Sequence, residues 1–231
     1  AVGSEALLLL TTGDRNTALG AQAGKNGITS DYATYIGYQA GANLSGDGNS
    51  SVGYQALRGI YSGGASSTGE YNTAIGYTAG LAITSGSYNV FFGATTGDSV
   101  TTGGENTLIG YFAAGALTTG SNNTCLGYNT AASLTTGQNN ILIGHEAATS
   151  SATVSNEITL GNSNNNSLRI PGLQSGATNG QVLTFNSTNG NITLADVGGA
   201  SEIDDLSDGV SNSSGVTLGL GTGALANDDG T

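Results

Sequence analysis

Along the first two-thirds of the chain, an apolar residue followed by glycine recurs at a nearly constant interval. The successive intervals between these glycines are 17, 16, 23, 17, 17, 17, 17 and 17 residues. The long interval is one period with six extra residues inside the Gly/Ser-rich stretch 62–70, which predicts an exposed loop. A fixed period of this length predicts a solenoid with one rung per repeat. We number positions in each rung from this bend glycine, which is Gly20, Gly37, Gly53, Gly76, Gly93, Gly110, Gly127, Gly144 and Gly161 in turn.

The three residues before each bend glycine predict a short β-strand, and glycine follows because it tolerates positive φ at a bend. Side chains alternate along a strand, so positions −3 and −1 share one face. Position −1 is apolar in every rung, and we expect it to form the core; Ile109→Asp is therefore predicted to be strongly destabilising. The predicted core residues are Leu19, Ile36, Val52, Ile75, Phe92, Ile109, Leu126, Ile143 and Leu160.

Position −2 is mixed in size and polarity, and it becomes more apolar along the chain. We expect this partly apolar face to pack against another chain, with three copies around a common axis. Self-association suits a rung with one or two large apolar side chains, because so slender a column is hard to stabilise alone. The residues at position −2 are Ala18, Tyr35, Ser51, Ala74, Phe91, Leu108, Cys125, Leu142 and Thr159.

Four further positions complete the predicted rung. Position +3 is small and suits a tight corner, position +7 is a second apolar column, and position +10 is a turn glycine. Position −4 is asparagine in many rungs, which predicts either a ladder of stacked amides or a simple turn former. The second apolar column is Leu44, Ile60, Ile83, Val100, Leu117 and Leu134, and the asparagines are Asn72, Asn89, Asn106, Asn123 and Asn140.

Composition agrees with an all-β fold, a parallel β-solenoid of about nine 17-residue rungs. Glycine makes up 40 of 231 residues, without the period of three and the proline that collagen needs. The abundance of Gly, Asn, Ser and Thr disfavours long helices, and no apolar run is long enough to span a membrane. A net charge of −12 argues against nucleic acid as a partner. The absence of methionine indicates a processed or excised piece of a longer protein.

Tyrosines recur at position +1, where they suit either packing at the corner or contact with sugar rings. His145 occupies the same position and is expected to replace tyrosine as a planar side chain rather than to catalyse a reaction. The candidate glycan-contact column is Tyr38, Tyr54, Tyr77, Tyr111 and Tyr128.

No other residue predicts catalysis, a cofactor or a metal. Cys125 is expected to be a small buried hydrophobe, because a nucleophile would need a nearby histidine. Asp204, Asp205 and Asp208 could attract a cation, but their spacing matches no calcium motif, so a solvated linker is expected. Glycoside hydrolysis needs two carboxylates that face each other across a sugar, and the repeats are not expected to provide such a pair. Adjacent threonines such as Thr101 and Thr102 point to opposite faces of a strand, which disfavours a flat ice-binding array.

The repeat resembles those of known fibre proteins. Residues 72–80 read Asn-Thr-Ala-Ile-Gly-Tyr-Thr-Ala-Gly, which is similar to repeats in phage tail fibres. They also resemble the head repeats of trimeric autotransporter (YadA-like) adhesins, in which an Ala-Ile-Gly motif marks each turn of a β-roll, typically at a shorter period. Residues 156–162 followed by 167–170 are similar to tail-fibre sequences that lie ahead of a chaperone-type autocleaving end domain, and residues 179–184 followed by 194–198 resemble tail-fibre linker modules. The resemblance covers about residues 14–162 and implies a trimeric fibre.

The sequence divides into five segments. Residues 1–13 are a lead-in, 14–162 the solenoid, 163–200 a connector with a β-hairpin, 201–214 an acidic linker, and 215–231 a restarted repeat with its bend at Gly221. We therefore expect a homotrimeric shaft of a phage tail fibre in the virion, presenting a tip that binds a host glycan or other receptor. The alternatives are a bacterial surface adhesin or extracellular filament subunit, and a polysaccharide-degrading spike.

Overall fold

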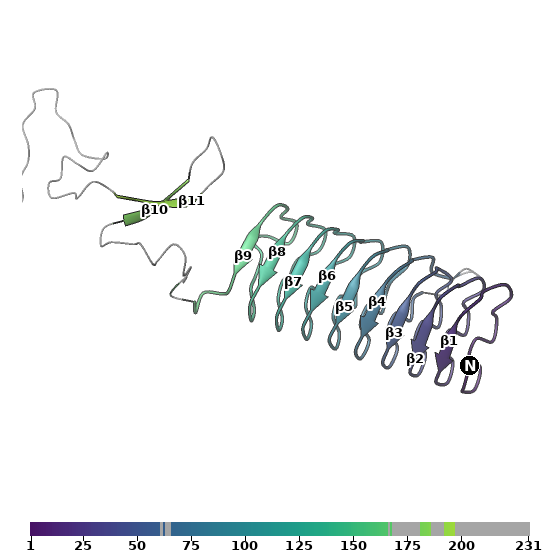
Figure 1. Ribbon diagram of the computed structural model, residues 1–231. Coiled ribbons are helices and arrows are strands. Elements are labelled where there is room, and N and C mark those ends of the chain that lie inside the picture. Colours follow the sequence, from purple (N-terminus) through teal and green to yellow (C-terminus); the bar gives the residue numbers. More distant parts are fainter. Residues whose placement is uncertain (61, 63–65, 166, 168–180, 186–191, 197–231) are drawn as a thin grey trace, which may run out of the picture. The chain divides into compact units, whose positions relative to one another are not determined.

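The computed structural model describes residues 1–60, 62, 66–165, 167, 181–185 and 192–196, and every regular element among them is a β-strand. The chain divides into two units, residues 1–166 and 167–231. The first unit is a β-solenoid whose short strands stack in sequence order into one sheet of nine (Figure 1). The strands are β1 (Thr17–Leu19), β2 (Thr34–Ile36), β3 (Ser50–Val52), β4 (Thr73–Ile75), β5 (Val90–Phe92), β6 (Thr107–Ile109), β7 (Thr124–Leu126), β8 (Ile141–Ile143) and β9 (Ile158–Leu160).

Each strand occupies positions −3 to −1, as the repeat predicts, and pairs in parallel with the next strand in strict register. Leu108 lies opposite Phe91 on one side and Cys125 on the other, all at position −2. The register holds across the long interval, because Val52 pairs with Ile75. The predicted period and strand positions are therefore confirmed.

The prediction that position −1 forms the core is wrong for the single chain. Position −2 points inward instead: Tyr35, Phe91, Leu108 and Leu142 are fully buried. At position −1, Ile36 and Ile109 are partly exposed, and the other side chains are exposed. The exposed members are Leu19, Val52, Ile75, Phe92, Leu126, Ile143 and Leu160. The face expected to meet another chain is thus the interior, and the expected interior is an outer face.

The interior volume is filled jointly by positions −2 and +4 of each rung and of its neighbours. Where position −2 holds Tyr35, position +4 is Gly41, and a Cβ there would lie 2.3 Å from the ring. In the next rung the pair is reversed, with Ser51 beside a fully buried Leu57. Where both positions are small, as in the rung of Gly80, the side chains of Leu57 and Phe91 from the adjacent rungs lie against the glycine. Position −2 can therefore vary from Ala to Phe while the column stays packed.

The backbone of each rung depends on a bend glycine with a conformation that only glycine adopts easily. Gly110 has a φ of +135°, and a Cβ there would lie 2.1 Å from the carbonyl oxygen of Gly127. Positions −5 and +2 also have positive φ, although most rungs have a residue other than glycine there, such as Tyr88 or Gln39. The φ of these non-glycine residues lies between 50° and 64°. These left-handed corners were not predicted from the sequence.

The asparagines at position −4 form the predicted ladder of amides. Asn106 is fully buried; its Nδ2 donates to Oδ1 of Asn89 at 3.0 Å and to the carbonyl oxygen of Gly120 at 2.9 Å. Its Oδ1 in turn accepts hydrogen bonds from the backbone N–H and Nδ2 of Asn123. The ladder runs without a break from Asn49 to Asn140.

The ends of the solenoid differ from the predicted boundaries. Residues 1–13 are not a separate lead-in, because Val2 bridges Leu19 in parallel and the N–H of Leu7 donates to the carbonyl oxygen of Ala23. The second apolar column is buried except at Ile60, which is exposed; Ser67 takes its place by pairing with Leu44.

The second unit contains the predicted hairpin. Its strands β10 (Gln181–Phe185) and β11 (Ile192–Asp196) pair antiparallel. The acidic linker 201–214, with Asp204, Asp205 and Asp208, and the restarted repeat at 215–231 lie outside the described residues.

Candidate functional site

The outer face of the nine-stranded sheet carries an apolar side chain at position −1 in every strand, beside threonine or serine at position −3 in six strands. Positions −3 and −1 lie on it, and the relative exposure of Leu19, Phe92 and Leu160 is 48%, 51% and 57%. None of the residues in strands β1–β9 is charged. At its C-terminal end both positions are aliphatic, with Ile141 and Ile158 at −3. The continuous apolar row at position −1 is suited to association with another surface of the same kind.

The tyrosines at position +1 form two stacks separated by Ala94. Tyr38, Tyr54 and Tyr77 stack with centroids 5.4 Å and 5.2 Å apart, and Tyr111 lies 5.5 Å from Tyr128. Tyr54 and Tyr128 are stacked on both faces, so solvent reaches mainly their edges and hydroxyl groups, and the end rings of each stack are covered on one face. A sugar packs against a ring face, and this geometry therefore favours the packing role for the column over sugar binding.

His145 continues the second tyrosine stack, as the sequence predicts. Its ring lies 5.1 Å from that of Tyr128 with an interplanar angle of 10°. The nearest ionisable partner is Glu146, whose carboxylate is 3.7 Å from Nδ1, and both side chains are exposed. Cys125 is buried at position −2, so the structure does not bring the histidine and the thiol together in a catalytic pair.

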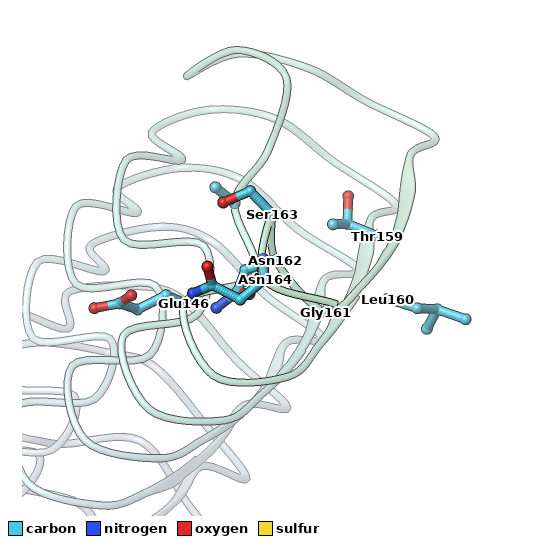
Figure 2. A pocket seen from close by; sticks show the side chains of 8 residues that line it. Glu146, Thr159, Leu160, Gly161, Asn162, Ser163 and Asn164 are labelled. Atoms are coloured by element: carbon cyan, nitrogen blue, oxygen red, sulfur yellow. Dashed lines mark hydrogen bonds between the residues drawn. The ribbon is translucent and has the colours of Figure 1, made fainter. Parts of the chain in front are cut away.

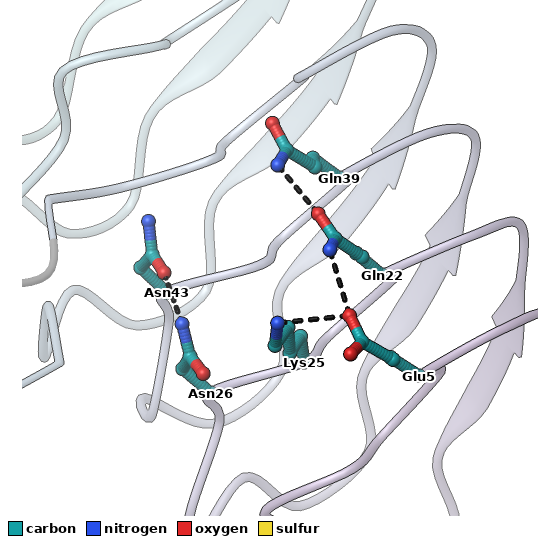
Figure 3. Close-up of polar contacts among 6 residues, drawn as sticks. All are labelled: Glu5, Gln22, Lys25, Asn26, Gln39 and Asn43. Carbon is teal, nitrogen blue, oxygen red and sulfur yellow. Dashed lines mark hydrogen bonds and ion pairs between the residues drawn. The ribbon is translucent and has the colours of Figure 1, made fainter.

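Polar side chains on the outside of the N-terminal rungs also form ladders (Figure 3). Gln39 donates to Gln22 at 2.6 Å, and Gln22 donates to Glu5 at 2.7 Å. Lys25 donates to the same carboxylate at 2.8 Å, which holds the pKa of Glu5 below its usual value. These amides and charges link one rung to the next, so their role is structural.

A hollow of about 560 Å³ lies at the C-terminal end of the solenoid (Figure 2). It is lined by Thr159, Asn162 and Asn164 together with Glu146, and Leu160 points away from the coils. The hollow lies beyond the last interior side chain of the column and holds one exposed carboxylate. It therefore offers no acid–base pair and no metal-ligand set.

Cys125 supplies a direct test of the inward direction of position −2. Burial raises the pKa of its thiol to about 12. Because the ordinary value is 9.0, the thiolate fraction at pH 8 falls about a thousandfold. We expect iodoacetamide to label the native chain at least a hundredfold more slowly than the chain in 6 M guanidinium, measured by mass spectrometry. Equal rates would contradict the burial of this position.

The described residues show neither a metal-ligand cluster nor a membrane-spanning helix. Among the described residues, no group of three or more His, Cys, Asp or Glu side chains could hold a metal ion. No helix in the described part of the chain is long and apolar enough to cross a membrane. Comparisons with family models, curated proteins and solved structures gave no match for this chain.

Proposed function

We propose that the chain is a structural and adhesive shaft segment of a homotrimeric phage tail fibre, which presents a host-receptor-binding tip. The observation that carries this proposal is the exposed apolar row at position −1, which runs along all nine strands on a face without charged residues. A soluble chain that remained a monomer would leave this face in water, whereas three copies packed face to face around one axis would cover it.

The size of the face suits a stable interface. Taking about 150–200 Å² for a fully exposed large apolar side chain, position −1 with Val90, Ile141 and Ile158 exposes on the order of 800 Å². This exceeds the patches of a few hundred Å² usual on monomers, and it matches the roughly 800 Å² that each partner contributes to a standard interface.

The same geometry supports a mechanical role. Nine rungs at about 4.8 Å span roughly 40 Å, and each is joined to the next by backbone and side-chain hydrogen bonds. Such a stack is extended by adding rungs without changing its cross-section. The resemblance of the repeats to tail-fibre sequences favours a viral fibre among the structures that could use this shape.

The mass of the purified chain in solution, measured by light scattering after size exclusion, tests the assembly. We expect three times the chain mass of 22.6 kDa, about 68 kDa. Leu126→Lys places a charge on the outer face and should give single chains with an unchanged circular dichroism spectrum. Thr136→Lys places the same charge in the same rung outside the sheet and should remain trimeric. A single-chain or dimeric wild-type mass would overturn the trimer.

Location tests the viral part of the proposal. Antibodies raised against the chain should label the tails of virions in electron micrographs and block their adsorption to host cells. Labelling of a bacterial cell surface in the absence of virions would overturn the assignment to a phage.

A further inference from the structure

A polar groove of about 420 Å³ runs along one corner of the solenoid, across the rungs that follow Tyr88. Apart from Thr102, its lining comes from two adjacent repeat positions, −5 and −6, so the same backbone geometry presents each side chain one rung further along. The lining residues that matter here are Tyr88, Glu105 and Asn122 at position −5 and Ser87, Ser121 and Gln138 at position −6.

Tyr88 has a ring face that no other aromatic ring covers, as do Tyr77 and Tyr111 at the ends of the +1 stacks, and it also lines this groove. Tyr71 stacks on one face, with centroids 5.4 Å apart. The next rung carries Glu105 at the same position, and no other aromatic ring stacks on Tyr88 in the described part of the chain. The side chain is 59% exposed. The groove therefore begins at a flat aromatic platform.

Hydrogen-bonding groups follow this platform along the groove. Within the described residues, the side chains of Glu105, Asn122 and Gln138 make no hydrogen bond. Their backbones are fixed nevertheless, because the N–H of Glu105 donates to Ser87 and that of Asn122 donates to Gly104. The Ser121 hydroxyl accepts from the N–H of Gly104 at 3.1 Å and keeps its own proton free to donate. The groove thus offers a carboxylate acceptor, two amides and a hydroxyl on a fixed backbone.

We propose that this groove binds a neutral hexose-containing oligosaccharide, with one sugar ring stacked on Tyr88 and its hydroxyl groups bonded to Glu105, Asn122 and Gln138. A pyranose ring has an apolar C–H face that packs against an aromatic ring, and it has polar edges that need both donors and acceptors. The unpaired carboxylate of Glu105 can accept two hydroxyl groups of one sugar, which is a charge-assisted and therefore strong contact.

Charge selects among glycans. The chain carries a net charge of −12, and Glu105 is the charged member of the groove lining. An anionic polysaccharide would meet repulsion from both, so the ligand is neutral. The site lies on the shaft itself and binds whether or not a separate tip exists. It does not depend on the number of chains in the fibre.

The test uses the full chain and defined probes. Saturation-transfer NMR is run with maltotetraose, cellotetraose, mannotetraose and chitotetraose, and with tetragalacturonate as the anionic counterpart. We expect at least one neutral probe to bind. Tyr88→Ala should weaken that binding about tenfold, the loss of one stacked aromatic contact. Glu105→Gln keeps the shape but removes the charged acceptor, and it should weaken binding several-fold.

The matched control is Tyr128→Ala, which removes a tyrosine that is 49% exposed and whose ring is covered on both sides by Tyr111 and His145. It should leave binding unchanged. No binding of any neutral probe, a preference for tetragalacturonate, or an equal loss in Tyr128→Ala would overturn the proposal. The mass of Tyr88→Ala should equal that of the wild type; a changed mass would assign the groove to contact between chains and would also overturn it. Failure of glycan binding with a trimeric wild-type mass would leave the fibre proposal standing.

Discussion

Leu108→Asp is expected to prevent the solenoid from folding at neutral pH. Leu108 is fully buried at the centre of the column, in register with Phe91 and Cys125. None of the residues around it in the core cluster is charged, so the carboxylate would be unpaired in an apolar interior. The cost is on the order of 5 kcal/mol, comparable to the whole stability of a small domain. Circular dichroism at 20 °C should show loss of the native spectrum.

Acid should partly restore this variant. Burial raises the pKa of such a carboxyl group, so a folded chain would hold its proton at a pH where the unfolded chain has released it. Stability relative to the wild type should then increase as the pH falls from 7 towards 4. A deficit that does not change with pH would indicate a loss of packing rather than the burial of a charge.

The matched control lies one residue later. Ile109 is on the outer face and partly exposed, so water can reach a carboxylate there. We expect Ile109→Asp to keep the native spectrum and a cooperative melt while losing the trimeric mass. This result differs from the prediction made from sequence, which placed Ile109 in the core. Unfolding of Ile109→Asp with tolerance of Leu108→Asp would reverse the assignment of faces.

The period and the bends could be predicted because a single steric requirement repeats in every rung. Each bend glycine has a φ that other residues rarely adopt, and its Cα lies against the carbonyl group of the next bend glycine. A Cβ at Gly53 would lie 2.3 Å from the carbonyl oxygen of Gly76, even across the long interval. Sterics of this kind leave glycine as the residue that fits, so the spacing of glycines records the length of each rung.

The direction of the side chains was mispredicted because both faces of these strands are apolar. An unbroken run of large apolar residues suggested a core, but it also suits a flat outer face, whereas the interior is filled jointly by positions −2 and +4 of adjacent rungs. Tyr35 beside Gly41 and Ser51 beside Leu57 are two such combinations. The asparagines could have indicated the buried face. Amides that bond to one another need a site without water, and positions −4 and −2 share a face, so position −2 points into the interior.

The second aromatic position was missed for a different reason. Position −5 varies from Arg15 to Tyr88 to Asn156, so no residue type marks it as a column. What its members share is a left-handed backbone conformation, which costs roughly 1–2 kcal/mol for a residue other than glycine. The rung imposes this conformation through its hydrogen bonds, such as that from the N–H of Tyr88 to the carbonyl oxygen of Glu70. The groove beside Tyr88 arises from hydrogen bonds between rungs, so the sequence pattern alone does not reveal it.

Asn106→Asp is expected to destabilise the solenoid by about 3–5 kcal/mol at pH 7, although the two side chains have the same shape. The carboxylate cannot donate, so the hydrogen bonds to Oδ1 of Asn89 and to the carbonyl oxygen of Gly120 are lost. Both acceptors would then face a buried negative charge. Urea titration followed by circular dichroism gives the free energy of unfolding for the variant and the wild type.

Asn122→Asp makes the same chemical change at position −5, one residue before the ladder asparagine Asn123. The side chain of Asn122 is exposed and has no hydrogen bond within the described residues. We expect its free energy of unfolding to lie within about 0.5 kcal/mol of the wild type. The pair separates the two interpretations of the asparagine position. Aspartate is as good a turn former as asparagine, so a turn-forming residue would tolerate either substitution equally. A member of a donor–acceptor ladder tolerates only the exposed one, and equal effects of the two variants would contradict the ladder.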